Sequence, residues 1–284
     1  MKKFLKMTGN ILLYSVVYLY FQVCVGFIFS IVASLKYHNL KTPTQIQNMV
    51  LENAYVLTIG AAVISLFIYY LLLRKKNKPL WERCEFKRIT VKNFALIVLI
   101  ALSVTFIACS FLYATQNIFK DYSSVSNNIG KGIQSIPGLV SIIILIPIFE
   151  EILFRGLIFN ELRKNLNIVV SVILQAMIFG LFHGNLAQGL YTLLLGAVAA
   201  IIYIWTKSII SNIVLHICFN LAGTFIIPRI LMNTTHYIYL YLITAIIVLF
   251  GLLFTLYENT HNKKQLNLVY DVGNHDDLKN EDHL

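Results

Sequence analysis

Charged side chains are scarce in this sequence. They make up 13% of its 284 residues, whereas hydrophobic side chains make up 58%. A soluble domain carries about twice that share of charge. So few charges cannot form a water-facing surface, which excludes a soluble globular protein. Most of the chain must face lipid, and the predicted fold class is an all-α, polytopic helix bundle in a membrane.

Cysteine is also rare, and its spacing excludes two common uses. The four cysteines are Cys24, Cys84, Cys109 and Cys218, and none of them belongs to a CxxC pair. This pattern argues against a disulfide framework and against a thiolate zinc site. The cysteines are therefore interpreted as small buried hydrophobic residues.

Eight apolar runs are long enough to cross a bilayer as helices of about 20 residues. The first is too long for the apolar part of a signal peptide, so we expect it to remain as a span. The predicted organisation is three spans with a basic cytoplasmic loop (1–136), a core (137–227), a last span (228–257) and a flexible, polar cytoplasmic tail (258–284). The eight predicted spans are residues 9–35, 54–73, 93–115, 137–160, 167–183, 189–206, 208–227 and 236–256.

Lysine and arginine outnumber aspartate and glutamate, which gives a net charge of +10. With the N-terminus inside, seventeen of the bases fall on the cytoplasmic side and five on the outer side. This bias predicts that both termini are cytoplasmic. The bases flank apolar spans, so membrane lipids are the expected partner and nucleic acid is not. The oligomeric state is left open.

Ionisable residues inside the spans are very few. Of the 13 acidic residues only Glu150 and Glu151 lie in a span, and Arg155 is the only base there. Two of the seven histidines, His183 and His216, also fall in apolar segments. An ionisable group at the centre of a membrane helix costs about 2.5–3.5 kcal/mol. Such groups persist when they have partners and a function, so these residues mark the candidate site.

The spacing of residues in the fourth span predicts which of them meet. Glu151 and Arg155 are four residues apart, so they lie on one helix face and can form an ion pair. Glu150 points about 100° away from Glu151 and has no such partner in its own helix. Pro147, one turn earlier, removes a backbone donor and is expected to open or kink the helix.

Two more pairs of residues four apart lie in later spans. Phe179 and His183 share one face of the fifth span, and a second pair shares one face of the seventh, His216 and Asn220. At a rise of about 1.5 Å per residue, Glu150 and His183 can lie at the same depth. His216 is only about 12 Å from the start of its span, so the convergence of all these groups is a hypothesis.

This set of side chains suits the hydrolysis of an amide bond. The reaction needs an activated water, a donor for the tetrahedral oxyanion and a proton for the leaving amine. A glutamate in an apolar cavity is a stronger base than one in water, so Glu150 with His183 can activate the water. His216 and Asn220 can donate hydrogen bonds to the oxyanion. Glu150, His183 and His216 are equally a ligand set for one divalent metal such as Zn²⁺, and the sequence leaves this choice open.

The signatures of other membrane proteases, HExxH, GxSG and GxGD, are missing. What is present, in order, is EExxxR in the fourth span, FxxxH in the fifth and HxxxN in the seventh. This pattern, over residues 137–225, resembles the CPBP family, which groups type II CAAX prenyl proteases with bacteriocin-processing and self-immunity (Abi) proteins. The resemblance implies an all-helical intramembrane endopeptidase core.

The resemblance also implies roles for the motif residues. The first glutamate of the pair, Glu150, and the FxxxH histidine, His183, are the main catalytic groups. The family has been described both as metalloproteases and as glutamate-dependent peptidases, so the cofactor is not decided by the resemblance. The implied catalytic set is Glu150, Glu151, His183, His216 and Asn220, with Arg155 and Phe179 as structural support.

Three functions are compatible with these observations. The first is an intramembrane endopeptidase acting on a membrane-associated or leader-type peptide, in CAAX-like processing, bacteriocin or pheromone maturation, or bacteriocin self-immunity. The second is a proton-coupled transporter, because glutamate and histidine also build proton relays. The third is a non-catalytic immunity protein. The composition, rich in Ile, Asn and Lys, indicates a bacterial protein of the cell membrane.

Overall fold

The computed structural model describes residues 1–36, 42–74 and 78–280, with side chains placed as far as His261. Every regular element in this part of the chain is a helix, which confirms the predicted all-α fold. The first half contains α1 (Lys2–Lys36), α2 (Pro43–Glu52), α3 (Ala54–Leu73), α4 (Leu80–Cys84), α5 (Val91–Thr115) and α6 (Tyr122–Gly132). The second half contains α7 (Ile136–Val140), η1 (Ser141–Leu145), α8 (Ile146–Glu151), η2 (Ile152–Phe159), α9 (Asn160–Arg163), α10 (Ile168–Leu181), α11 (Leu186–Thr206), α12 (Ile209–Leu221), η3 (Ala222–Ile226), α13 (Ile227–Asn233), η4 (Thr235–Tyr237) and α14 (Ile238–Asn280).

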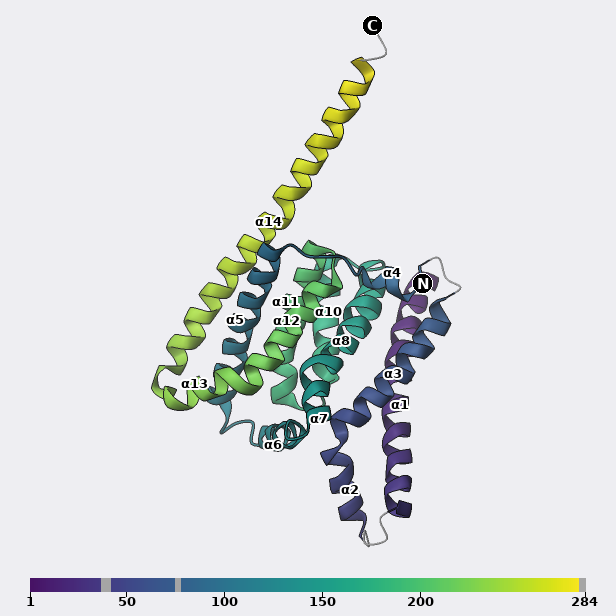
Figure 1. The fold of residues 1–284 in the computed structure, drawn as a ribbon, viewed down its shortest axis with the longest axis vertical. Coiled ribbons are helices and arrows are strands. Elements are labelled where there is room, and N and C mark those ends of the chain that lie inside the picture. The colour runs from purple at the N-terminus through teal and green to yellow at the C-terminus, as the bar shows by residue number, and fades with distance from the viewer. Residues whose placement is uncertain (37–41, 75–77, 281–284) are drawn as a thin grey trace.

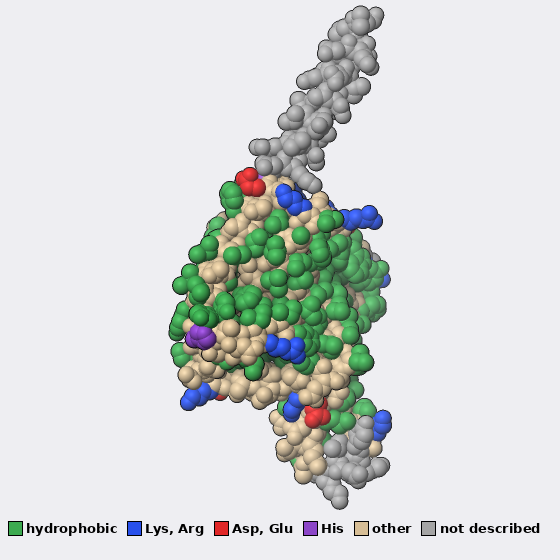
Figure 2. All heavy atoms as spheres, turned by 60° about the vertical axis from the view of Figure 1, so that its left-hand side comes forward, with side chains coloured by type: hydrophobic (Ala, Val, Ile, Leu, Met, Phe, Trp, Pro, Cys, Tyr) green, Lys and Arg blue, Asp and Glu red, His purple; other side chains and the backbone are tan. Residues whose placement is uncertain are grey.

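Seven helices, or runs of consecutive helices, in the described residues are long and apolar enough to cross a membrane. The run Ile136–Arg163 contains α7 to α9, and the run Ile209–Asn233 contains α12 to α13. The helix α10 is apolar but shorter. Together they agree with the prediction of about eight spans. Hydrophobic side chains cover the middle of the molecule, and charged side chains lie mostly above and below them (Figure 2). The protein is an integral membrane protein.

The helices that carry the three motifs lie next to one another. The helix α12 packs against α5, α8 and α11. The helices α10 and α11 form a tightly packed hairpin, α14 runs along α5, and α1 pairs with α3 at the opposite edge (Figure 1). This arrangement places the fourth span between α3 and the α10–α12 group, so its polar side chains face other helices rather than lipid.

The fourth span is irregular around Pro147. The π-helical turns η1 and η2 lie on either side of α8. In η1 the Ile146 N–H donates to the Ser141 carbonyl, five residues back. The next residue, Pro147, has no N–H, so the Ile142 carbonyl has no donor in this register. The predicted opening of the helix at Pro147 therefore takes the form of a π-helical turn.

One end of the bundle is covered by residues 80–90, which include α4 and which we call the basic cap. The Asn160 amide and the Tyr203 hydroxyl both donate to the Arg83 carbonyl, at 2.7 and 3.1 Å. The Arg83 guanidinium also forms an ion pair with Glu161 at 3.1 Å. The basic cap thus fastens α4 to α9 and α11.

The basic cap also explains the depth at which α12 begins. The Ile209 N–H donates to the Glu85 carbonyl at 3.2 Å. The Ser208 hydroxyl donates to the Lys87 carbonyl. Both Ser208 and Ile209 are fully buried, so α12 starts beneath the cap rather than at the surface of the bundle. A recessed start places His216 deeper than its residue count suggests, which resolves the mismatch in depth expected from the sequence.

The helix α14 is longer than the predicted last span. It begins at Ile238 and keeps a helical backbone to Asn280. We expected a flexible polar extension from residue 258, and here the structure differs from that prediction. Residues 258–280 contain no proline and a single glycine, so the sequence holds no strong signal to stop the helix.

A substitution at Gly156 can show how closely the basic cap packs against the fourth span. A Cβ at this position would lie 2.5 Å from the Cys84 Sγ. We expect Gly156→Ala to lower the free energy of unfolding by about 1–3 kcal/mol, because the overlap pushes α4 away from η2. Removal of the sulfur in Gly156→Ala/Cys84→Ala should recover most of that loss. Thermal unfolding in detergent micelles measures both variants, and equal losses in the two would contradict the contact.

Candidate active site

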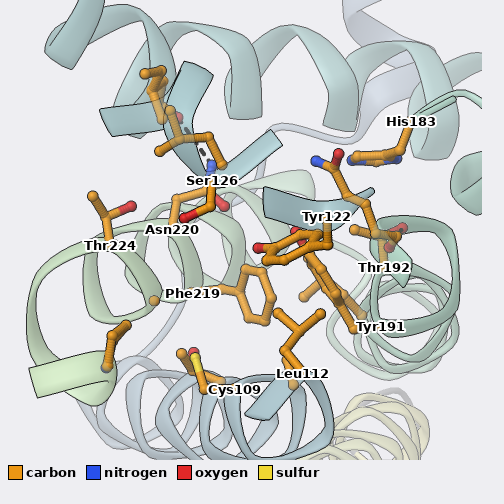
Figure 3. A pocket seen from close by; sticks show the side chains of 18 of the residues that line it. Cys109, Leu112, Tyr122, Ser126, His183, Tyr191, Thr192, Phe219, Asn220 and Thr224 are labelled. Carbon is orange, nitrogen blue, oxygen red and sulfur yellow. Dashed lines mark hydrogen bonds between the residues drawn. The ribbon is translucent and has the colours of Figure 1, made fainter. Parts of the chain in front are cut away.

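A cavity of about 820 Å³ lies among the helices that carry the motifs. Its wall includes Glu150 from α8, His183 from the α10–α11 turn, and His216 and Asn220 from α12. Figure 3 shows His183 and Asn220 in this wall. The structure therefore brings four of the five predicted catalytic side chains to one space. Ligand pockets typically measure about 300–1,000 Å³, so this cavity has room for a short stretch of peptide.

Glu151, the fifth predicted catalytic residue, is fully buried and does not line the cavity. Its Oε1 lies 2.8 Å from Arg155 Nη1 and 2.8 Å from His216 Nδ1. The Asn212 amide donates to its Oε2 at 3.3 Å. The prediction that Glu151 is catalytic is therefore revised, because it reaches the cavity only through His216. It is a positioning residue, and its predicted ion pair with Arg155 is present.

His216 connects the buried pair to the cavity. A carboxylate can only accept a hydrogen bond, so the contact with Glu151 assigns the proton to His216 Nδ1. The other ring nitrogen, Nε2, faces Glu150 and lies 3.5 Å from its Oε2. A carboxylate bonded to the far nitrogen in this way fixes both the tautomer and the ring orientation of a functional histidine.

His183 has the same tautomer for a different reason. Its Nδ1 lies 2.9 Å from the Phe179 carbonyl, which can only accept, so Nδ1 carries the proton and Nε2 is free. The Phe179 ring is fully buried and packs edge-on against both imidazoles, with ring centroids 4.9 Å from His183 and 5.8 Å from His216. The Phe179 ring thus contacts both histidines, and its role in orienting them stays a prediction.

A tight turn presents His183 to the cavity. Gly184 follows it with φ of 65°, a left-handed conformation that glycine adopts without strain. The next residue, Asn185, caps α11 by accepting a hydrogen bond from the Gln188 N–H at 3.1 Å. The sequence HGN thus ends α10, reverses the chain and starts α11 within three residues.

Asn220 completes the cavity wall beside the π-helical turn. Its Nδ2 donates to the Ile142 carbonyl at 2.9 Å. Pro147 leaves this carbonyl without a donor in its own helix, and the Asn220 amide replaces the missing donor. A side-chain amide has two N–H groups, so Asn220 keeps a second donor for a bound molecule.

Arg155 is completely buried, and several groups interact with its guanidinium. Besides Glu151, its Nη2 donates to the Gly196 carbonyl at 3.4 Å, and its guanidinium carbon lies 4.6 Å from the centre of the Phe179 ring. A buried cation persists when it is paired and hydrogen-bonded in this way. The structure contains the predicted ion pair of Arg155 with Glu151, and a supporting role for Arg155 in the site stays a prediction.

Sequence reasoning missed several residues of the site. Asn212 binds Glu151 and lies four residues before His216, so its place on the same helix face was a signal that could have identified it. Other cavity-lining residues carry no motif and become visible only in the fold. They include Tyr18, Gln22, Tyr122, Tyr191, Thr192 and Thr224.

A protein zinc site commonly uses three or four ligands placed close together. Among the residues that the structure describes, no group of three or more His, Cys, Asp or Glu side chains is placed to hold a metal ion. Glu150, His183 and His216 line one cavity but do not form such a group, so as arranged they do not fit the predicted metal-ligand set.

These features define the class of the protein: an integral membrane protein with a carboxylate, two imidazoles and an amide around a cavity within its helix bundle. Residues 132–222, which contain all three motifs, match the family described as type II CAAX prenyl endopeptidase Rce1-like. This match agrees with the resemblance to the CPBP family that the three motifs carry.

A second comparison finds a bacterial relative. The chain is 33% identical over 89 residues to "Putative membrane peptidase YdiL" of Bacillus subtilis (strain 168). The aligned part is 31% of this chain and 36% of the relative, so about a third of each protein is compared. No solved structure matches the chain significantly. Both matches support a membrane peptidase and leave its substrate open.

The pairing of Asn220 with Pro147 can be tested by a double-mutant cycle. Asn220→Ala removes the donor to the Ile142 carbonyl, and we expect it to cost about 1–3 kcal/mol of stability. In Asn220→Ala/Pro147→Ala the new backbone N–H of residue 147 can donate to the Ile142 carbonyl. Relative to wild type, the double variant should therefore lose less stability than Asn220→Ala alone. Thermal unfolding of the four proteins in micelles gives the coupling, and strictly additive effects would contradict the arrangement.

Because Glu151 and Arg155 form a buried ion pair, removing the charge of Glu151 should strongly destabilise the protein. Glu151→Gln keeps the shape of the side chain but leaves the Arg155 cation without a counter-charge, which should cost about 3–5 kcal/mol of stability. The control is Glu82→Gln at an exposed glutamate, which should leave unfolding nearly unchanged. The measurement is again thermal unfolding in micelles. An equal shift in both variants would show that Glu151 does not balance Arg155.

Proposed function

We propose that the protein is an intramembrane endopeptidase that hydrolyses a peptide bond in a membrane-associated or leader-type peptide. One observation carries this proposal: the Glu150 carboxylate shares a cavity with two imidazoles whose Nδ1 atoms are both engaged elsewhere. Among the described residues, no lysine or arginine forms an ion pair with Glu150. It therefore remains available as a base, in contrast to Glu151.

The proposed reaction begins with a water held between Glu150 and His183. The Nε2 lone pair of His183 accepts one hydrogen bond from the water, and the Glu150 carboxylate accepts the other and then takes the proton. The oxygen attacks the carbonyl carbon of the bound peptide and forms a tetrahedral intermediate.

Asn220 and His216 supply the remaining functions. The second N–H of the Asn220 amide donates to the oxyanion. His216 is a second donor when it enters the reaction already protonated on Nε2, and it keeps that proton throughout the cycle. The Glu151 carboxylate on its Nδ1 stabilises this imidazolium, as a buried carboxylate does in other hydrolytic sites. Protonated Glu150 then gives its proton to the leaving amine as the carbon–nitrogen bond breaks, which returns the site to its starting state.

The setting of the reaction is also part of the proposal. The bacterial relative and the composition support a location in the cell membrane of a bacterium. Suitable substrates are leader-type peptides, including those of bacteriocins and pheromones, or CAAX-like tails. Self-immunity to a bacteriocin is a further use of the same cleavage.

The proposal is tested by removing the base. We expect Glu150→Gln and His183→Ala to lower peptide hydrolysis by about 10²–10⁴-fold, because each removes a group that handles the proton. Glu82→Gln, at an exposed glutamate, is the matched control and should keep full activity. Comparative mass spectrometry of membrane peptides from cells with each variant reads out the cleavage, and immunoblotting of the membrane fraction confirms insertion.

Each contrary outcome points to a different function. Full hydrolysis by a normally inserted Glu150→Gln protein would refute the assignment of the base. Proton flux in proteoliposomes without any hydrolysis would indicate a proton-coupled transporter. Protection against a bacteriocin that survives Glu150→Gln would indicate a non-catalytic immunity protein.

A further inference from the structure

The cavity is closed at the end of the bundle that carries the basic cap. Between the cavity and this end lies a layer of residues that water does not reach, and hydrogen bonds tie it to the cap. A substrate cannot pass through this layer without unpacking the cap. The fully or almost fully buried members of the layer, each 0–2% exposed, are Arg155, Asn160, Tyr203, Ser208 and Ile209.

The cavity reaches the surface at the opposite end. There its wall is formed by the connection between α5 and α7, which includes α6 (Figure 1). Several residues of this connection line the cavity and are exposed, so the cavity opens between them. These residues are Gln116, Asn117, Lys120, Ser123 and Ser126.

The distribution of basic residues indicates which side each end faces. Of the lysines and arginines whose side chains are placed, twelve belong to segments at the end with the basic cap and four to segments at the end with α6 (Figure 1). Basic residues that flank membrane spans are retained on the cytoplasmic side. The closed end is therefore cytoplasmic and the open end extracytoplasmic. The twelve are Lys2, Lys3, Lys6, Arg74, Lys78, Arg83, Lys87, Arg88, Lys92, Arg163, Lys164 and Lys207; the four are Lys36, Lys120, Lys131 and Arg229.

We propose that the substrate enters the site from the extracytoplasmic face, past α6, as an extended and uncharged stretch of peptide. This inference rests on the proposed function and names the substrate class that the site accepts. Among the described lining residues, the only carboxylate is Glu150 and the only lysine or arginine is Lys120. A basic side chain beside the scissile bond would pair with Glu150 and occupy the proposed base. An acidic one would have no counter-charge deeper in the cavity than Lys120 at the opening, which is costly. Among the substrates proposed above, this route selects peptides presented outside the cytoplasm, and it excludes a CAAX-like tail on a cytosolic protein.

The route is tested by thiol labelling that does not depend on catalysis. Cys24, Cys109 and Cys218 are first replaced by serine. Cys84 is kept, because burial raises the pKa of its thiol to about 12 and leaves it unreactive at neutral pH. Single cysteines are then introduced as Ser126→Cys at the opening, Thr224→Cys inside the cavity and Lys207→Cys at the basic end as control.

A membrane-impermeant, positively charged methanethiosulfonate is applied to intact cells and to inside-out vesicles. We expect Ser126→Cys and Thr224→Cys to be modified in intact cells and to lose this labelling in inside-out vesicles, with Lys207→Cys showing the reverse. Modification of Thr224→Cys only in inside-out vesicles would overturn the proposal. Absence of modification from either side would overturn it as well, because the cavity would then be closed to water.

Two further arms separate this inference from the proposed function. The labelling is repeated with Glu150→Gln, so a protein that hydrolyses nothing can still reveal the route, and the reverse route would leave the peptidase assignment intact. For the active protein, synthetic peptides are supplied on one side of proteoliposomes whose orientation the Lys207→Cys label reports. Cleavage should be greater for an uncharged sequence on the α6 side, and equal cleavage of peptides with Asp or Lys beside the scissile bond would contradict the substrate class.

Discussion

The site depends on one buried ion pair, in which Glu151 lies 2.8 Å from both Arg155 and His216. Burying charge is costly unless partners replace the lost water, and Asn212 and the Gly196 carbonyl serve as such partners here. The pair also makes two adjacent glutamates unequal. Glu151 is neutralised by Arg155 and holds an imidazole in place, whereas Glu150 faces the cavity, where its Oε2 lies 3.5 Å from His216 Nε2. Packing around Glu151 therefore leaves Glu150 as the glutamate that reaches the cavity.

The other parts of the site come from departures from a regular helix. A carbonyl without a donor is expensive in a membrane, so a break in a span must be compensated by a neighbouring group. Here the π-helical turn at Pro147 exposes the Ile142 carbonyl, and the amide of Asn220 on α12 binds it. The recessed start of α12 under the basic cap then places His216 at the depth of Glu150. Each irregularity positions a polar side chain of the cavity wall.

Much of this arrangement was predictable, and the limits have physical causes. The length of apolar runs predicts the spans, and α3 begins and ends at the expected residues 54 and 73. Spacing of four residues predicts the pairing of Glu151 with Arg155, because it is a property of one helix. The contacts of Glu151 with Asn212 and His216 join residues more than sixty positions apart, and the cover of α12 by the basic cap joins residues more than one hundred apart. Spacing within one helix cannot predict such contacts, so the different surroundings of Glu150 and Glu151 became visible only in the fold.

The shortness of α10 relates the site to the thickness of the bilayer. With 14 residues it is about 21 Å long, whereas the hydrocarbon core of a typical bilayer measures about 30 Å. Its outward side chains, such as Val169, Ile173 and Leu181, are exposed in the bundle and must meet acyl chains. Lipid next to this helix has to thin or water has to reach its end, and that end carries His183. The hydration of the site is therefore coupled to hydrophobic mismatch, so membranes of different acyl length should change how readily water reaches the imidazole.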